Sequence, residues 1–257
     1  MQAPTALDTP TTPRAAPAMP VPRRLVTDAP TRMFHALFAL SFLGAYLTAD
    51  GERWRMLHVT LGYTMAGLLA FRVAYGLLGP RQSGLGLLWR KLSSAPDWLR
   101  STAEALRQAA FADINWRLGQ NLLMALAVVL LMAMVVPITL TGYATFNDWG
   151  DFLGGDWLGE VHEFFGEAFL LVVLAHLVLI ASLSVLRRQN GVLPMLTGRV
   201  AGRGPDLVKK NRVWLAVLLL AAVLAYGAWE WQQSPNGLIP SQAFSSASRD
   251  HHRDHGD

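Results

Sequence analysis

Long apolar stretches separated by polar segments dominate the chain. A helix needs about 20 mostly apolar residues to cross the ~30 Å hydrocarbon core of a bilayer. No strand-period alternation competes with this pattern, so each stretch is interpreted as a helix. The first stretch is the shortest, and we expect the residues that flank it to complete the span. The sequence therefore predicts five transmembrane helices, at Met33–Ala49, Trp54–Leu78, Leu118–Tyr143, Val161–Leu186 and Val213–Trp231.

The composition agrees with a membrane protein. Of the 257 residues, 52% are hydrophobic and only 16% are charged, whereas a soluble domain carries about 25% charged residues. This balance excludes a disordered chain. The chain has no cysteine, which excludes disulfides, iron–sulfur clusters and the covalent attachment of c-type haem.

The basic residues are distributed unevenly among the predicted loops. If the N-terminus is cytoplasmic, 17 of the 22 Lys and Arg residues lie on the cytoplasmic side, as the positive-inside rule requires. The opposite loop at 144–159 holds Asp148, Asp151 and Asp156 and no basic residue. We therefore expect a cytoplasmic N-terminus and a periplasmic C-terminus. The net charge of +4 then reflects topology, and we expect no nucleic-acid partner.

The remaining segments divide the chain into parts. Residues 1–30 are rich in Pro, Thr and Ala and predict a disordered cytoplasmic tail. Residues 31–200 hold the first four spans, and 201–231 hold a loop and the fifth span. The segment near 95–112 has a helical period, and we expect it to lie on the cytoplasmic membrane face. Residues 232–257 form a polar periplasmic tail.

Four of the seven histidines fall inside the predicted spans. His35 lies on the first span, His58 on the second, and His162 and His176 on the fourth. Ionisable groups in hydrocarbon are costly and usually functional. One such histidine alone would be interpreted as a buried hydrogen-bonding residue. Four of them, with no Asp or Lys deep in the spans, indicate a shared role.

The depths of these histidines match in pairs. His176 follows His162 by 14 residues, roughly 21 Å along a helix and on nearly the same face. With the topology above, His58 lies at the depth of His162 on the periplasmic side. His35 lies at the depth of His176 on the cytoplasmic side. The sequence therefore predicts two imidazole pairs at two levels of one bundle.

Two facing imidazoles suit the axial ligation of a haem iron and leave no open coordination position. A zinc or copper site would gather three or four donors at one level. Without cysteine the haem must be held non-covalently, so we expect two b-type haems. They would be ligated by the pairs His35/His176 and His58/His162.

Four further residues are candidates for haem contact. Gly62 and Gly166 each follow a periplasmic-side histidine by four residues, and a missing side chain there would let the porphyrin lie against the helix. Helix packing is the alternative for these glycines. Arg72 and Arg32 could pair with haem propionates, although Arg32 serves equally well as a topology anchor.

Short motifs accompany the four histidines. They are Arg32-Met-Phe-His35, His58-Val-Thr-Leu-Gly62, Phe71-Arg72-Val-Ala-Tyr-Gly76, Gly79-Pro-Arg81, Val161-His162-Glu163, His176, Asn190 and Met195-Leu-Thr-Gly198-Arg199. With these motifs the chain, over roughly residues 30–200, resembles the bacterial cytochrome b561 family. That group includes the cytochrome b subunits of nickel–iron hydrogenases and thiosulfate reductases. The resemblance implies a four-helix core with two b haems ligated from helices one, two and four.

Three parts of the chain depart from this pattern. Many relatives carry Gly-His-Asn-Pro at the start of the third helix, where this chain has Arg117-Leu-Gly-Gln-Asn121. The fifth span carries no ligand, and we expect it to pack against the core or to dock a partner. The tail histidines, His251, His252 and His255, could bind a metal loosely, but a solvated tail is the favoured interpretation.

These expectations combine into one hypothesis. The chain is an all-α membrane protein, a four-helix transmembrane haem-binding bundle plus a fifth transmembrane helix, in the bacterial inner membrane. It carries electrons between quinone and a periplasmic c-type cytochrome or a dehydrogenase- or hydrogenase-type subunit, with which the acidic loop could dock. Glu163 is a candidate proton relay to quinone, and a solvated carboxylate is its alternative.

Two other functions stay open at this point. The chain could itself be an enzyme that oxidises superoxide or another small reductant and reduces quinone. A histidine-containing transporter for protons or metals is the alternative from another class. It needs a water-filled path lined by ionisable groups, and the predicted spans offer few.

Overall fold

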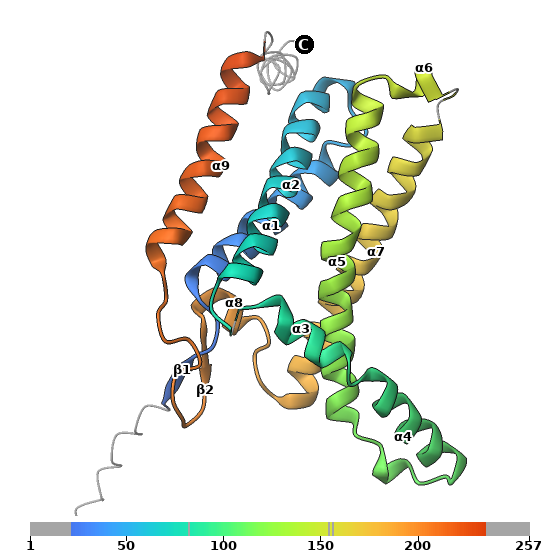
Figure 1. Ribbon diagram of the computed structural model, residues 1–257, viewed down its shortest axis with the longest axis vertical. Helices are drawn as coiled ribbons and strands as arrows, with labels where there is room; N and C mark the ends of the chain where they lie inside the picture. The colour runs from blue at the N-terminus through green and yellow to red at the C-terminus, as the bar shows by residue number, and fades with distance from the viewer. Residues whose placement is uncertain (1–21, 82, 154, 156, 235–257) are drawn as a thin grey trace, which may run out of the picture.

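The computed structural model describes residues 22–81, 83–153, 155 and 157–234. Most of this part of the chain is helical, and long helices run side by side (Figure 1). The five longest are α1 (Ala29–Leu47), α2 (Arg55–Leu78), α5 (Trp116–Phe146), α7 (Trp157–Arg187) and α9 (Val213–Gln233).

Four helices are long and apolar enough to cross a membrane, which makes the chain a multi-pass membrane protein. They correspond to the second to fifth predicted spans. The first predicted span, α1, is not among them, because Pro30, Arg32 and His35 make that helix less apolar. The count of five spans therefore stays a prediction. The four qualifying segments are Glu52–Leu78, Trp116–Phe146, Trp157–Arg187 and Val213–Gln233.

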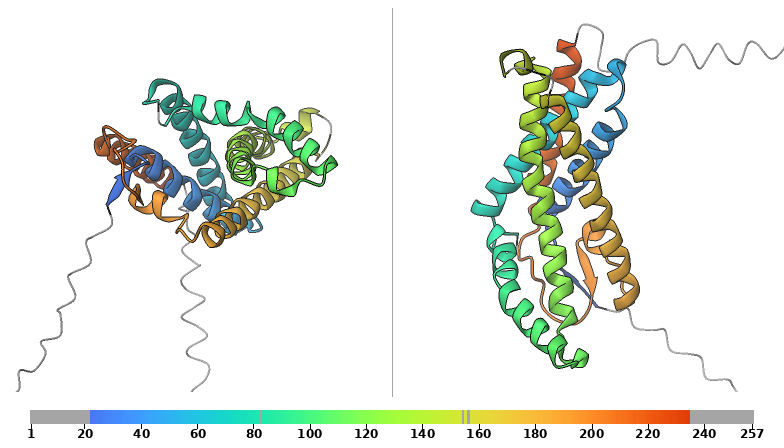
Figure 2. Two further views of the ribbon diagram at one scale, coloured as in Figure 1. Left: turned by 90° about the horizontal axis from the view of Figure 1, so that it is seen from below. Right: turned by 90° about the vertical axis from the view of Figure 1, so that its right-hand side faces the viewer.

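The helices pack in a defined order. α7 lies along α5, α2 contacts both α1 and α5, and α9 packs against α1. Figure 2 shows the bundle end-on, with α9 at its edge beside α1. This order places α9, which lies outside the four-helix core, next to α1, the first helix of the chain.

A small apolar core lies in the middle of the bundle. Met65 of α2, Val135 of α5 and Phe169 of α7 are almost fully buried together. Two phenylalanines of α1 join α7 to this core, since the ring centroid of Phe169 lies 4.8 Å from that of Phe42 and 6.3 Å from that of Phe38. Aromatic side chains thus bridge α1 and α7.

Two amphipathic helices connect α2 to α5. They are α3 (Leu85–Leu92) and α4 (Ala95–Arg107), followed by the short η2 (Phe111–Asp113). α4 contacts the start of α5 through Trp98, whose indole Nε1 donates to the carbonyl of Asn115 at 3.0 Å. A helix is therefore present where the period near 95–112 predicts one, and its location relative to a membrane stays a prediction.

A two-stranded antiparallel sheet lies at the same end of the bundle as α3 and α4 (Figure 1). β1 (Arg23–Leu25) pairs with β2 (Arg199–Ala201), which follows α8 (Leu193–Thr197), and Arg24 lies opposite Val200. We expected no strands, because three-residue strands are too short to leave a period in the sequence.

The ordered chain thus begins before residue 31. Residues 22–30, which we expected to belong to a disordered tail, form β1 and the start of α1. Residues 1–21 of that tail lie outside the described residues. So do residues 235–257 of the C-terminal tail, including its three histidines.

The opposite end of the bundle carries short elements. The 3-10 helix η1 (Glu52–Trp54) precedes α2, and α6 (Trp149–Leu153) connects α5 to α7. The C-terminal end of α9 lies at this same end (Figure 1).

Candidate functional site

The structure brings His58 and His162 together. His58 lies in the first turn of α2 and His162 in the second turn of α7. Their ring centroids are 5.9 Å apart and the ring planes are nearly perpendicular, at 84°. The two rings that the depth argument pairs on the periplasmic side therefore face one another across the bundle.

Each of these rings is anchored by a backbone carbonyl of a neighbouring helix, α1 for His58 and α5 for His162. His58 Nδ1 lies 2.8 Å from the carbonyl oxygen of Ala45 in α1, and His162 Nδ1 lies 2.9 Å from that of Ile138 in α5. A carbonyl only accepts, so both Nδ1 atoms carry the proton and donate it. The Nε2 atom of each neutral ring then keeps a free lone pair, which is the state that metal-binding histidines need.

The spacing of the pair leaves room for one metal atom. Two metal–imidazole bonds of about 2 Å each, extended to the ring centres, place the centroids about 6 Å apart. The observed 5.9 Å matches this distance. Among the described residues no group of three or more His, Asp or Glu side chains gathers in one place. The donor set at this level is therefore two imidazoles, which fits the axial ligation of a haem iron.

Gly142 of α5 allows His162 to take this position. A β-carbon at residue 142 would lie 2.8 Å from Cε1 of His162, closer than real side-chain contacts allow. The Thr141 hydroxyl also lies 3.3 Å from His162 Nδ1. Our sequence analysis missed Gly142, because a glycine in an apolar span carries no local signal of what packs against it.

The second pair, His35 and His176, is arranged differently. His176 of α7 interacts electrostatically with His35 of α1. The Nδ1 atom of His176 is buried and makes no hydrogen bond within the described part of the chain. The side chain of His35 is exposed. His176 lacks the carbonyl contact that holds Nδ1 of both outer rings, and iron ligation by the inner pair stays a prediction.

Phe169 separates the two levels. It stands seven residues after His162 and seven before His176 on α7, and none of its surface is exposed. Seven residues make about two helical turns, so all three side chains share one face. The two histidine pairs therefore lie on either side of the apolar core.

The glycines singled out from the sequence face open space. A β-carbon at Gly62 or at Gly166 would have no atom within 4 Å. Both follow an outer histidine by one helical turn. The same open space surrounds a β-carbon at Gly67, Gly159 or Gly227, so haem contact at Gly62 and Gly166 stays a prediction.

The two arginines make contacts within the protein. Arg32 Nη1 donates to the carbonyl of Leu196 at 3.0 Å, which ties α1 to α8. Arg72 is buried, donates to the carbonyl of Ser83 at 3.0 Å and interacts electrostatically with Asp28. The contacts seen here therefore position both side chains on protein groups, and propionate pairing stays a prediction.

Asp28 is a second residue that the sequence analysis missed. It is fully buried at the N-cap of α1, and its carboxylate accepts from Thr31 N (3.2 Å), Tyr75 Oη (2.6 Å) and Ser83 Oγ (2.7 Å). Burial raises the pKa of this carboxyl, but the three hydrogen bonds outweigh burial and lower the pKa below 3.8. An Asp just before Ala-Pro is a recognisable helix start, but its contacts with α2 are not local.

The acidic residues on the opposite side make few contacts. Glu163, Asp148 and Asp151 are exposed, and Asp156 lies outside the described residues.

In the segment that departs from the family pattern, Gln120 Oε1 and Asn121 Oδ1 accept from Arg187 Nη2 at 2.9 and 3.3 Å.

Comparison with known proteins gives one match. The profile of the family described as prokaryotic cytochrome b561 matches residues 26–198, which is more than half of the chain and includes all four histidines. The helix α9 lies outside this range. No curated protein and no solved structure matches the chain significantly.

Proposed function

The chain belongs to the prokaryotic cytochrome b561 family, and on this premise we propose that it is a di-haem b-type cytochrome of the bacterial inner membrane. One haem would be held by His58 and His162 and the other by His35 and His176. Electrons would pass between the two haems, across or into the membrane. We assign both haem sites to residues 31–200 and treat α9 as an addition to that domain.

The outer histidine pair is the observation that carries this proposal. Two rings from different helices, 5.9 Å apart, each have Nδ1 hydrogen-bonded to a backbone carbonyl. In a neutral ring that donates from Nδ1, Nε2 keeps the lone pair that would bind iron. Support for the inner site comes from the positions of His35 on α1 and His176 on α7, two helices that are in contact through Phe169.

In this mechanism the protein would hold the two haems, orient the histidines that bind them and keep water out of the space between them. Haem supplies reversible one-electron chemistry at its iron. The Ala45 and Ile138 carbonyls hold the two outer imidazoles in one orientation, and Gly142 lets His162 approach α5. The apolar layer around Phe169 excludes water between the two levels. None of the side chains in this layer titrates, so the layer offers no proton path between the two levels.

Quinone and a periplasmic redox protein are the exchange partners that we propose. The exposed Asp148 and Asp151 suit a basic c-type cytochrome or a hydrogenase-type subunit. Glu163 is exposed beside His162, so it can exchange a proton with water while a quinone reacts nearby.

The test is the spectrum of the full-length protein purified from haem-replete cells. We expect two six-coordinate low-spin b haems in a redox titration. His58→Ala or His162→Ala should remove one of them, and His35→Ala or His176→Ala should remove the other. His252→Ala, in the C-terminal tail, is the control and should keep both. A colourless preparation, or the loss of the same haem from His58→Ala and His35→Ala, would contradict the proposal.

A further inference from the structure

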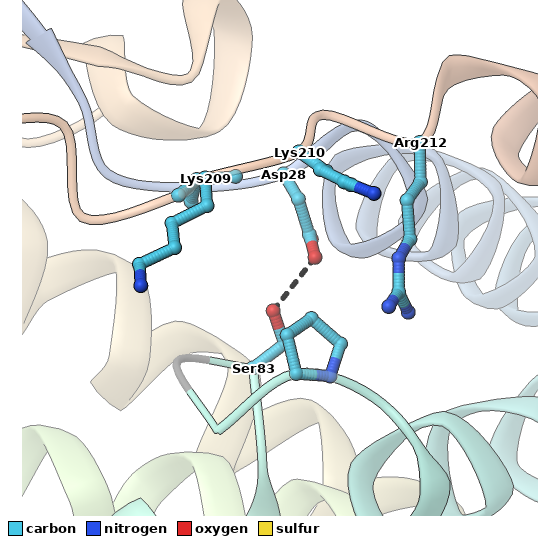
Figure 3. Close-up of a pocket in the computed structure, with 7 residues that line it drawn as sticks. Asp28, Ser83, Lys209, Lys210 and Arg212 are labelled. Atoms are coloured by element: carbon cyan, nitrogen blue, oxygen red, sulfur yellow. Dashed lines mark hydrogen bonds between the residues drawn. The ribbon is translucent and has the colours of Figure 1, made fainter.

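A pocket of about 290 Å³ lies at the end of the bundle that carries the sheet. It opens between the start of α1, the turn after α2 and the segment before α9. Figure 3 shows Asp28 and Ser83 at its centre, with Lys210 and Arg212 on one side of Asp28 and Lys209 on the other. Three of the charged groups that line it are therefore cations, and one is a carboxylate.

The carboxylate does not neutralise these cations. Asp28 accepts three hydrogen bonds and interacts with Arg72, which lies deeper in α2. Lys209 and Lys210 are exposed, and neither ammonium forms an ion pair or a hydrogen bond with any residue that the structure describes. The nearby Asp206 is used elsewhere, since its Oδ1 accepts from Leu25 N. The pocket therefore keeps an uncompensated positive charge.

Arg212 lines the pocket from the position before α9. It adopts a left-handed conformation, with φ at +46°, just before the first residue of α9. Residues other than glycine rarely adopt the left-handed conformation, and backbone strain of this kind often occurs at binding sites. Its guanidinium lies 6.0 Å from the ring centroid of Tyr75, half-buried against α2.

Exposed apolar side chains flank the pocket on the side of the helices. Leu77 and Leu78 end α2 with 71% and 88% of their surface exposed. Val213 and Trp214 begin α9 with 54% and 67% exposed. Tryptophan at the end of a membrane helix is typical of the headgroup region. Cations and apolar surface thus meet at one depth, at the boundary between hydrocarbon and water.

We propose that this pocket binds the phosphate of an anionic glycerophospholipid. The three cations would contact the headgroup, while the ends of α2 and α9 would contact the acyl chains. Basic pockets between transmembrane helices recognise such headgroups. The bound lipid would join α9, which lies outside the family range, to the four-helix core. This proposal needs a membrane-embedded chain, but it depends neither on haem binding nor on the orientation of the chain.

The test is native mass spectrometry of the full-length protein in detergent, titrated with phosphatidylglycerol, phosphatidylcholine or inorganic phosphate. We expect phosphatidylglycerol to bind at least tenfold more tightly than phosphatidylcholine. The double variant Lys209→Gln/Lys210→Gln should weaken phosphatidylglycerol binding about 25-fold, since each interfacial cation contributes about fivefold. The control Arg199→Gln/Arg203→Gln removes the same charge from exposed positions near β2 and should change binding less than twofold.

Two further measurements keep the outcome clear. Raising the salt concentration should weaken phosphatidylglycerol binding to the unmodified chain, because exposed charges are screened; this arm needs no variant to fold. Equal binding of both lipids, or an unchanged affinity in Lys209→Gln/Lys210→Gln, would overturn the proposal. Displacement of phosphatidylglycerol by millimolar inorganic phosphate would show a site for free anions and would also overturn it.

Discussion

At the scale of single residues, the outer histidine pair depends on groups that carry no chemistry of their own. The carbonyls of Ala45 and Ile138 orient the two rings, and Gly142 makes space for one of them. Each of these groups lies on a helix other than the one that carries the histidine. The reactivity of an imidazole here is therefore decided by the backbone that faces it.

Gly142→Ala tests this dependence. The added methyl group would lie 2.8 Å from His162 Cε1, and overpacking of this kind costs about 1–3 kcal/mol. We expect a lower unfolding temperature and a change in the absorption and EPR spectra of the haem at His58/His162. Gly159→Ala is the matched control, because a β-carbon there meets no atom within 4 Å. An unchanged spectrum and stability in Gly142→Ala would show that His162 does not need this close approach.

At the scale of elements, α1 is the helix whose placement depends most on its neighbours. It is less apolar than the four candidate spans, and its N-terminal end is held by polar contacts. Arg32 ties it to α8, and Asp28 joins its first turn to α2 through Tyr75 and to the following turn through Ser83. Because α1 carries His35, these contacts also set the position of the inner pair.

Asp28→Asn should loosen this junction. The neutral amide is a weaker hydrogen-bond acceptor than a carboxylate. A hydrogen bond to a charged group contributes about 1.5–3 kcal/mol to the free energy of unfolding. The lowered pKa of Asp28 means that the ionised form stabilises the fold. The stabilisation by the ionised carboxylate is complete above the pKa that Asp28 has in the unfolded chain, near 3.8. It is lost as the pH falls through the lower pKa that Asp28 has in the folded chain.

The measurement is the unfolding temperature of the purified protein between pH 3 and pH 7. The unfolding temperature of the unmodified chain should fall at the acid end of this range. Asp28→Asn should have a lower unfolding temperature at pH 7 and a smaller decrease toward pH 3. Asp97→Asn, an exposed residue of α4, is the control and should follow the unmodified chain. Parallel curves for Asp28→Asn and the unmodified chain would contradict the role of this carboxylate.

At the scale of the whole molecule, the two ends of the bundle differ in charge and in structure. One end carries the sheet, α3, α4 and the basic pocket, whereas the other carries α6 with Asp151 (Figure 1). This asymmetry agrees with the distribution of Lys and Arg in the sequence. By the positive-inside rule we expect the first end to face the cytoplasm.

Cysteine labelling in intact cells tests this orientation directly, because the chain has no cysteine of its own. Asp151→Cys in α6 should react with a membrane-impermeant maleimide before the cells are opened. Arg100→Cys in α4 should react only after the inner membrane is permeabilised. The reverse pattern would place the N-terminus in the periplasm, and the unmodified chain controls for background labelling.

Much of the site is a matter of position along helices, and this part was accessible from the sequence. The 14 residues between His162 and His176 put both on one face at two depths, and His58 indeed faces His162. The contacts of Asp28 and Gly142 were not accessible, because each depends on a segment at least 20 residues away. The strands β1 and β2 were missed for the same reason, since Leu25 pairs with Arg199.

The sequence by itself determined where the apolar helices run and how far along its helix each histidine lies. Both follow from local quantities, the length of an apolar stretch and the rise of a helix. Only the tertiary structure decided which carbonyl anchors each outer ring, where α9 packs, and that the basic segment 209–212 meets Asp28 and Ser83 at one pocket. These depend on how helices distant in the chain approach one another, and hydropathy, which acts residue by residue, does not specify that approach.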